Sequence, residues 1–96
     1  MKAYLVLDLL VHDFTGFKTY IEEIPTFIAK HGGQYIVRGV APDTIEGDWS
    51  PERLVTFEFP ARPNAEAFLG DPEIQELFKL RHATTTSRLV LADGCT

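Results

Sequence analysis

An arginine within an apolar strand is the feature of this sequence with the clearest chemical meaning. Arg38 lies in the segment 34–40 among apolar neighbours. A guanidinium group forks onto carboxylates and stabilises developing oxyanion charge, so Arg38 could orient an anionic substrate. Because a buried charge must be paired, the alternative is a structural ion pair with Asp8 or Glu58 across the sheet. Arg38 is therefore a candidate substrate-binding residue with a structural alternative.

Two carboxylates and a histidine are the candidate catalytic residues for proton transfer. Asp8 and Glu58 could act as general bases if burial raised a pKa toward neutrality. His31, like His82, could serve as an acid–base group near pH 7. The alternative for each of the two carboxylates is a structural ion pair. The alternative for His31 and for His82 is that each only caps backbone carbonyls at a helix end. No short His or Cys spacing predicts a metal site, and no cofactor is expected.

Arg81 and Trp49 complete the candidate substrate-binding residues. Arg81 continues the apolar helical stripe of Ile74, Leu77 and Phe78, so its guanidinium group could reach a cleft. The alternative is a cation at a helix end that favours the helix dipole and extends to solvent. Trp49 lies in an acidic loop, where it could close over a cavity or anchor the rim of a subunit interface.

Length and composition bound the class of protein. The 96 residues fit a single domain, residues 1–96, and the 45% hydrophobic content predicts a folded chain. A net charge of −5 argues against a nucleic-acid partner, because such partners need a basic face. Asp8 interrupts the short apolar run 3–11, so neither a signal peptide nor a membrane span is expected. With a lone cysteine, Cys95, a cytoplasmic protein without disulfides is the default expectation.

The periodicity of the apolar residues predicts the order β-α-β-β-α-β. Alternating or apolar runs predict strands, and recurrences at helical spacing predict helices. The expected strands span 3–11, 34–40, 53–59 and 87–92. The expected helices begin after Asp13, run briefly over 65–69, and restart with Asp71 as N-cap and Pro72 in the first turn. Pro25 is expected to kink the first helix without ending it. Tyr20 is expected to be ordinary helix surface or core.

Right-handed crossovers would place the helices over one face of an antiparallel sheet with strand order 4-1-3-2. The fold class is therefore α+β, a ferredoxin-like βαββαβ sandwich. Period-two alternation assigns four polar residues to the other, otherwise apolar face: Tyr4, Asp8, Arg38 and Glu58. An open apolar face of this size is unusual in a soluble monomer, so a homodimer with two sheets packed face to face is expected.

The motifs, taken in order, resemble one family. They are 31–39 (HGGQYIVRG), 46–49 (EGDW), 53–60 (RLVTFEFP), 71–81 beginning DPE, and 88–90 (RLV). This pattern is similar to the domain-of-unknown-function family 1330. The resemblance implies the dimeric α/β-barrel superfamily, in which two ferredoxin-like sheets form a joint barrel, but it implies no activity. Monooxygenases without cofactors, muconolactone-type isomerases and haem-binding oxidoreductases elsewhere in that superfamily are analogies of fold only.

Two functional hypotheses of different class follow. The first is a cofactor-independent enzyme, isomerase-like or monooxygenase-like, acting on a small anionic or phenolic metabolite oriented by Arg38 and Arg81. The second is a non-catalytic small-molecule-binding or stress-related dimeric module, in which the polar residues only secure the dimer and the sheet register. Two arginines are expected to point inward, which is more than one structural ion pair requires, and this favours the first hypothesis.

Overall fold

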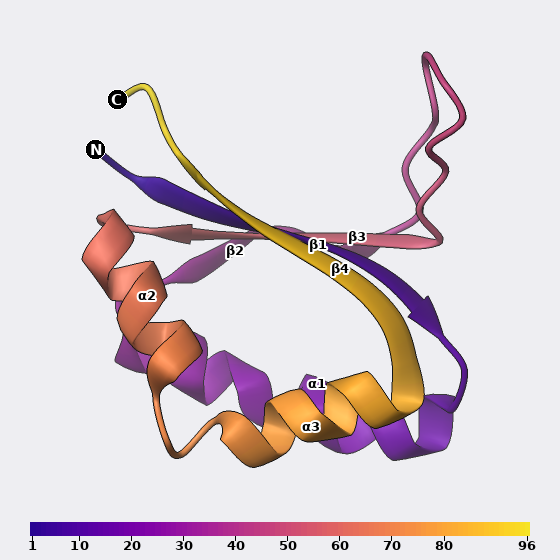
Figure 1. Cartoon of the computed structure of the whole chain (residues 1–96), viewed down its shortest axis with the longest axis horizontal. Helices are drawn as coiled ribbons and strands as arrows, with labels where there is room; N and C mark the ends of the chain where they lie inside the picture. Colours follow the sequence, from indigo (N-terminus) through magenta and orange to yellow (C-terminus); the bar gives the residue numbers. More distant parts are fainter.

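The computed structural model describes residues 1–96 as two layers, a sheet and a set of helices. The sheet consists of β1 (Ala3–Val11), β2 (Gln34–Val40), β3 (Arg53–Phe59) and β4 (Thr85–Asp93). The helices are α1 (Phe14–Lys30), α2 (Arg62–Gly70) and α3 (Gln75–Thr84). Figure 1 shows the helices on one side of the sheet and the loop 41–52, between β2 and β3, extending on the other side. None of the helices combines the length and hydrophobicity needed to cross a membrane.

The strands are hydrogen-bonded in the order β2-β3-β1-β4, and every pair is antiparallel. This is the predicted order 4-1-3-2 counted from the other edge, so the ferredoxin-like α+β fold is confirmed. The central strand β1 alternates strictly, and its helix-facing residues Ala3, Leu5, Leu7 and Leu9 are at most 3% exposed. Burial on one face only explains this alternation, because successive side chains of a strand point to opposite sides.

One apolar core of 16 buried residues fills the space between the two layers. Phe68 of α2 contacts three other aromatic rings in it, with centroid distances of 6.1 Å to Phe57, 5.4 Å to Phe59 and 5.6 Å to Phe78. Such pairs add about 0.5–1.5 kcal/mol each beyond the burial of area. Phe68 therefore fixes the short helix α2 against β3 and α3.

The first helix follows the prediction. The Asp13 carboxylate accepts a hydrogen bond from the Gly16 amide at 3.0 Å, which satisfies one of the free donors at the start of α1. Pro25 lies inside α1, and the helix continues to Lys30 as expected.

The predicted start of the last helix was wrong. α3 begins at Gln75, not at Pro72, and β4 begins at Thr85, two residues before the expected start. The Asp71 carboxylate accepts from the Glu73 amide at 2.9 Å, and this local turn competes with helical geometry. Residues 72–74 therefore form a turn that joins α2 to α3.

The alternation predicted for β2 was also wrong, because this edge strand has two register irregularities. They lie between Tyr35 and Val37 and between Arg38 and Val40. Tyr35 pairs with Phe57 and Arg38 pairs with Val55, and both partners are buried on the helix side. An extra residue in one strand shifts the following side chains to the opposite face. Arg38 therefore lies on the helix side of the sheet, away from the face where it was expected.

Candidate functional site

A cleft of about 230 Å³ lies between α1 and the strands β1, β2 and β3. Its twelve lining residues are Leu7, Leu9, Phe17, Tyr20, Ile21, Ile24, Tyr35, Arg38, Gly39, Arg53, Val55 and Phe57. The set is mostly apolar and aromatic, with two arginines and no carboxylate or histidine. An apolar cavity with a few convergent polar groups is the usual form of a small-molecule site.

The irregular backbone of β2 places the first arginine in this cleft. Gly39 follows Arg38 at the second register irregularity. Its φ is +70°, a backbone conformation that favours glycine. The Arg38 guanidinium carbon lies 4.4 Å from the centre of the Tyr35 ring. Stacking on an aromatic ring holds a guanidinium group in place while its donors remain free for an anion.

A second arginine, Arg53, enters the cleft from the start of β3. Its guanidinium carbon lies 5.3 Å from the centre of the Phe14 ring at the beginning of α1. Neither Arg38 nor Arg53 is within ion-pair distance of a carboxylate. The structural alternative for Arg38, a pair with Asp8 or Glu58, is therefore wrong. The cleft carries uncompensated positive charge in a protein whose net charge is −5.

Arg81 does not line the cleft, although it contacts Tyr20, which does. The side chain is 5% exposed, so the alternative in which it extends to solvent is wrong, and it has no carboxylate partner. It donates to the Tyr20 hydroxyl at 3.3 Å, and its Nε is buried without a hydrogen-bond partner. Its other terminal nitrogen lies 3.3 Å from Nε2 of His82, which must accept because a guanidinium group only donates. Arg81 reaches the cleft only through Tyr20.

Two tyrosines place hydroxyl groups at the cleft. Burial raises the pKa of Tyr35 to about 12, with Tyr20 adding to the shift and Arg38 opposing it. Burial also raises the pKa of Tyr20, against the opposing charge of Arg81. Both hydroxyls therefore keep their protons at neutral pH and act as hydrogen-bond donors, not as bases.

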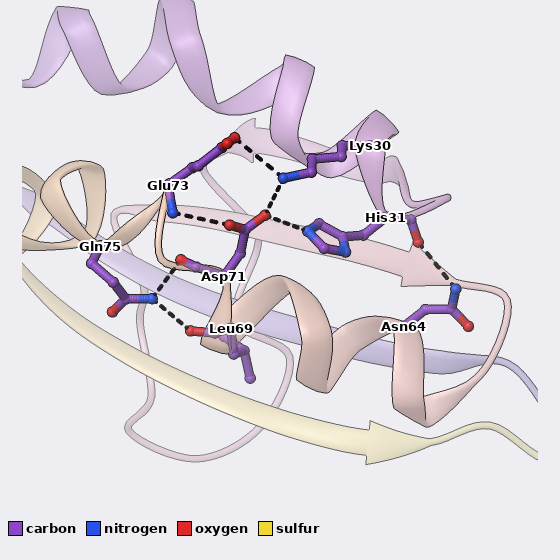
Figure 2. A network of polar contacts seen from close by, with 7 residues as sticks. All are labelled: Lys30, His31, Asn64, Leu69, Asp71, Glu73 and Gln75. Carbon is purple, nitrogen blue, oxygen red and sulfur yellow. Dashed lines mark hydrogen bonds and ion pairs between the residues drawn. The ribbon is translucent and has the colours of Figure 1, made fainter.

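His31 lies in a different part of the molecule, at the end of α1 (Figure 2). Its Nε2 contacts the Asp71 carboxylate at 2.8 Å, and the Lys30 ammonium contacts the same oxygen at 2.7 Å. The Lys30 and His31 contacts, with the backbone amide of Glu73, hold the pKa of the Asp71 carboxyl far below its usual range. This network joins the end of α1 to the turn between α2 and α3. His31 does not line the cleft, and its proposed catalytic role stays a prediction.

Glu58 lies on the face of the sheet away from the helices. Its carboxylate contacts the Lys2 ammonium at 2.8 Å, the Gln34 amide at 2.8 Å and the Tyr4 hydroxyl at 3.4 Å. The Lys2 contact, with smaller contributions from Gln34 and Tyr4, lowers the pKa of Glu58. A general base at Glu58 would need a pKa raised toward neutrality, and this condition is not met.

Asp8 and Trp49 meet on the same open face. The Trp49 indole nitrogen donates to the Asp8 carboxylate at 2.9 Å, and the indole side chain is half exposed. Trp49 lies beside Val90 and Arg88 of β4, not over the cleft. The structure therefore separates Asp8 and Trp49 from Arg38, with the sheet between them. Trp49 does not line the cleft, and its place at the rim of a subunit interface stays a prediction.

Sequence reasoning missed three residues of the cleft: Tyr20, Tyr35 and Arg53. Tyr20 has a detectable signal, because its spacing from Phe17 and Ile24 puts a hydroxyl on the buried stripe of α1. A buried tyrosine hydroxyl usually requires a polar partner, and here the partner is Arg81.

The fold and the cleft define a small ferredoxin-like α+β protein with a cavity between its sheet and its first helix. The chain belongs to the family DUF1330, a domain of unknown function whose model matches residues 2–95. No curated protein matches this chain.

Solved structures of low sequence identity share the fold. A protein of unknown function from Rhodopseudomonas palustris, RPA0582, is 16% identical with a TM-score of 0.80, covering 99% of this chain and 83% of that one. SnoaB, a cofactor-independent oxygenase from Streptomyces nogalater, is 18% identical with a TM-score of 0.71 over 99% and 94%. A dimeric ferredoxin-like protein of unknown function from Jannaschia sp. CCS1 is 9% identical with a TM-score of 0.74 over 98% and 100%.

Proposed function

We propose that this protein binds a small aromatic or enolic anion in the cleft and acts on it as a cofactor-independent, monooxygenase-like enzyme. The observation that carries the proposal is the pair of cleft arginines, Arg38 and Arg53, which have no carboxylate partners. A guanidinium group that stacks on an aromatic ring and is not paired suits a planar anion. In a chain of net charge −5, this local positive charge is selective for anions.

The size of the cleft restricts the ligand. Sites for drug-sized ligands measure roughly 300–1,000 Å³. At about 230 Å³, this cleft suits a compact ligand of one or two rings. Its walls of phenylalanine, tyrosine and leucine side chains favour a flat, apolar body with the charge at one end.

The lining residues favour oxygenation over isomerisation. An isomerase needs a group that takes up and returns a proton, and the cleft contains no carboxylate or histidine. An oxygenase without a cofactor takes the electrons that reduce dioxygen from its substrate, which therefore has to ionise to an electron-rich enolate or phenolate. Cationic groups stabilise that ionised form. The fold shared with SnoaB supports the proposal as an analogy.

Binding is tested by calorimetry with 1-hydroxy-2-naphthoate and its methyl ester. The acid should bind at least about tenfold more tightly than the ester, because a charge-assisted hydrogen bond contributes about 1.5–3 kcal/mol. R38M should abolish this preference, whereas R62M, which changes an exposed arginine outside the cleft, should keep it. Equal binding of acid and ester by the wild-type protein would contradict the anion-binding site.

Turnover is tested with 1-naphthol and isotopically labelled dioxygen. One oxygen atom should enter the ring to give 1,4-naphthoquinone, and the two displaced hydrogens should leave with the other oxygen atom as water. The rate should exceed that of the uncatalysed reaction and fall in R38M. Binding of naphthoate without oxygen incorporation from any phenolic probe would instead support the alternative, a non-catalytic small-molecule-binding module.

We also propose that the chain is a homodimer through the open face of its sheet. Large apolar side chains are exposed there and on the adjoining loop: Leu10 by 43%, Val40 by 56%, Ile45 by 87%, Trp49 by 53% and Val90 by 60%. Exposed apolar patches of this kind usually mark an interface. The Jannaschia structure, described as dimeric, supports the proposal through its fold.

The oligomeric state is tested by analytical ultracentrifugation at micromolar concentration. The wild-type protein should sediment as a dimer, and V90E should sediment as a monomer because the charge would be buried in the interface. A67E, on the outer surface of α2, is the control and should remain dimeric. A monomeric wild-type protein would contradict the proposal.

A further inference from the structure

Arg81 is a buried cation whose position has no evident structural benefit. It is 5% exposed, no carboxylate neutralises it, and its Nε has no hydrogen-bond partner. Burying such a group opposes folding unless it is paired. Its partners are the Tyr20 hydroxyl, the His82 ring, and the rings of Phe78 and Tyr20, whose centres lie 5.2 and 5.8 Å from the guanidinium carbon. An arrangement of this cost calls for a function beyond packing.

We infer that Arg81 is a positioning residue that directs the Tyr20 hydroxyl proton into the cleft, so that the cleft recognises the oxyanion of a phenolate or enolate. This inference rests on the proposed function and specifies which oxygen of the ligand is bound and in which ionisation state.

The hydrogen-bonding capacity of Tyr20 supports this inference. A phenolic oxygen accepts and its proton donates, and Arg81 can only donate. The bond of 3.3 Å from Arg81 therefore occupies an acceptor site of the Tyr20 oxygen. No group of the protein accepts the Tyr20 proton, and Tyr20 lines the cleft. The proton remains available to a ligand oxygen, and donation from a cation makes the hydroxyl a stronger donor.

The charges around Tyr20 all favour an anion. Arg81 faces it from α3, Tyr35 and Arg38 line the same cleft from β2, and Arg53 lines it from β3. The cleft residues of β1, Leu7 and Leu9, are apolar. His82 contacts Arg81 and does not line the cleft. Burial raises the pKa of both tyrosines at this cleft, but a ligand oxygen here would in addition accept the Tyr20 proton, so a bound phenol should ionise at a lower pH than the free phenol.

The test uses 4-nitrophenol, whose phenolate absorbs visible light and whose neutral form does not. Bound to the wild-type protein, it should titrate about one pH unit or more below the free compound, equivalent to about tenfold tighter binding of the phenolate. Y20F and R81M should each remove most of this shift. The double variant should lose no more than either single variant, because both changes break one chain of interactions. R81K should restore part of the shift, and R62M should leave it unchanged.

The outcomes separate this inference from the proposed function. If neither 4-nitrophenol nor 1-hydroxy-2-naphthoate binds the wild-type protein, both fail. If they bind with the arginine dependence described above but Y20F keeps the wild-type titration, the inference alone is overturned. Y20F keeps the aromatic ring in the core, so this result does not depend on whether R81M folds. Additive losses in the double variant would also overturn it, because Arg81 would then act independently of Tyr20.

Discussion

Replacing Arg81 with methionine should stabilise the folded protein while weakening its recognition of phenolates. The change removes a buried charge that has no carboxylate partner and an Nε without a hydrogen bond. A buried unsatisfied polar group costs about 1–3 kcal/mol, and a buried ion costs several more in desolvation. Methionine has a similar length and no polar hydrogen, so it fits the space without these costs.

The interactions lost are modest. The hydrogen bonds to Tyr20 and His82 are both 3.3 Å long, at the weak end of the range, and contribute about 0.5–1.5 kcal/mol each. The contacts with the Phe78 and Tyr20 rings contribute about 0.5–1 kcal/mol each. Buried ionic groups replaced by apolar residues of similar volume typically stabilise by about 1–4 kcal/mol. We therefore expect a gain in the free energy of unfolding of about 1–2 kcal/mol.

The assay is urea denaturation followed by circular dichroism, with thermal melting as a second measurement. The midpoint should rise with an unchanged slope, and Tm should rise by about 4–8 °C for each kcal/mol. The double variant with Y20F should be at least as stable, because the Tyr20 hydroxyl loses its partner in R81M. A loss of about 3 kcal/mol or more in R81M would refute the reasoning, since it would show that Arg81 holds the core together.

Three further changes test the fold and the cleft. G33A should lower the free energy of unfolding, measured by denaturant, by about 1–3 kcal/mol, because a Cβ there would lie 2.6 Å from the Phe59 ring. The control G70A has open space around it and should be neutral or stabilising by up to about 1 kcal/mol. Equal effects of the two changes would contradict this core geometry. G39A should cost about 1 kcal/mol or more, because φ is +70°, and should weaken naphthoate binding by displacing Arg38; an unchanged affinity would argue against the site. Folding lowers the pKa of Asp71, so this residue should contribute fully to the free energy of unfolding above about pH 5. Its contribution should decline as the pH falls below about 4, because protons then bind the unfolded chain preferentially. D71N should therefore have a flatter acid limb in a plot of stability against pH, and a parallel limb would contradict the network of Figure 2.

Local pattern was sufficient to identify the four strands and the first helix. The apolar run 3–11 predicted β1, and the apolar residues at helical spacing predicted α1 and its buried side. The predicted strand order followed from the handedness of the crossovers. Local pattern failed at Asp71, where the side chain forms a turn in place of a helix cap. It failed again in β2, where register irregularities interrupt the alternation that places Arg38.

The sequence by itself determined the fold, the apolar core and the family, because all three depend on short-range periodicity and on motifs in a fixed order. Only the tertiary structure decided the site. Arg81 and Tyr20 are 61 residues apart, and they meet because α1 and α3 pack side by side on the same face of the sheet. Arg38 reaches the cleft only because β2 is irregular where it pairs with β3. Neither event leaves a local signal, because each depends on which surfaces of distant segments come into contact.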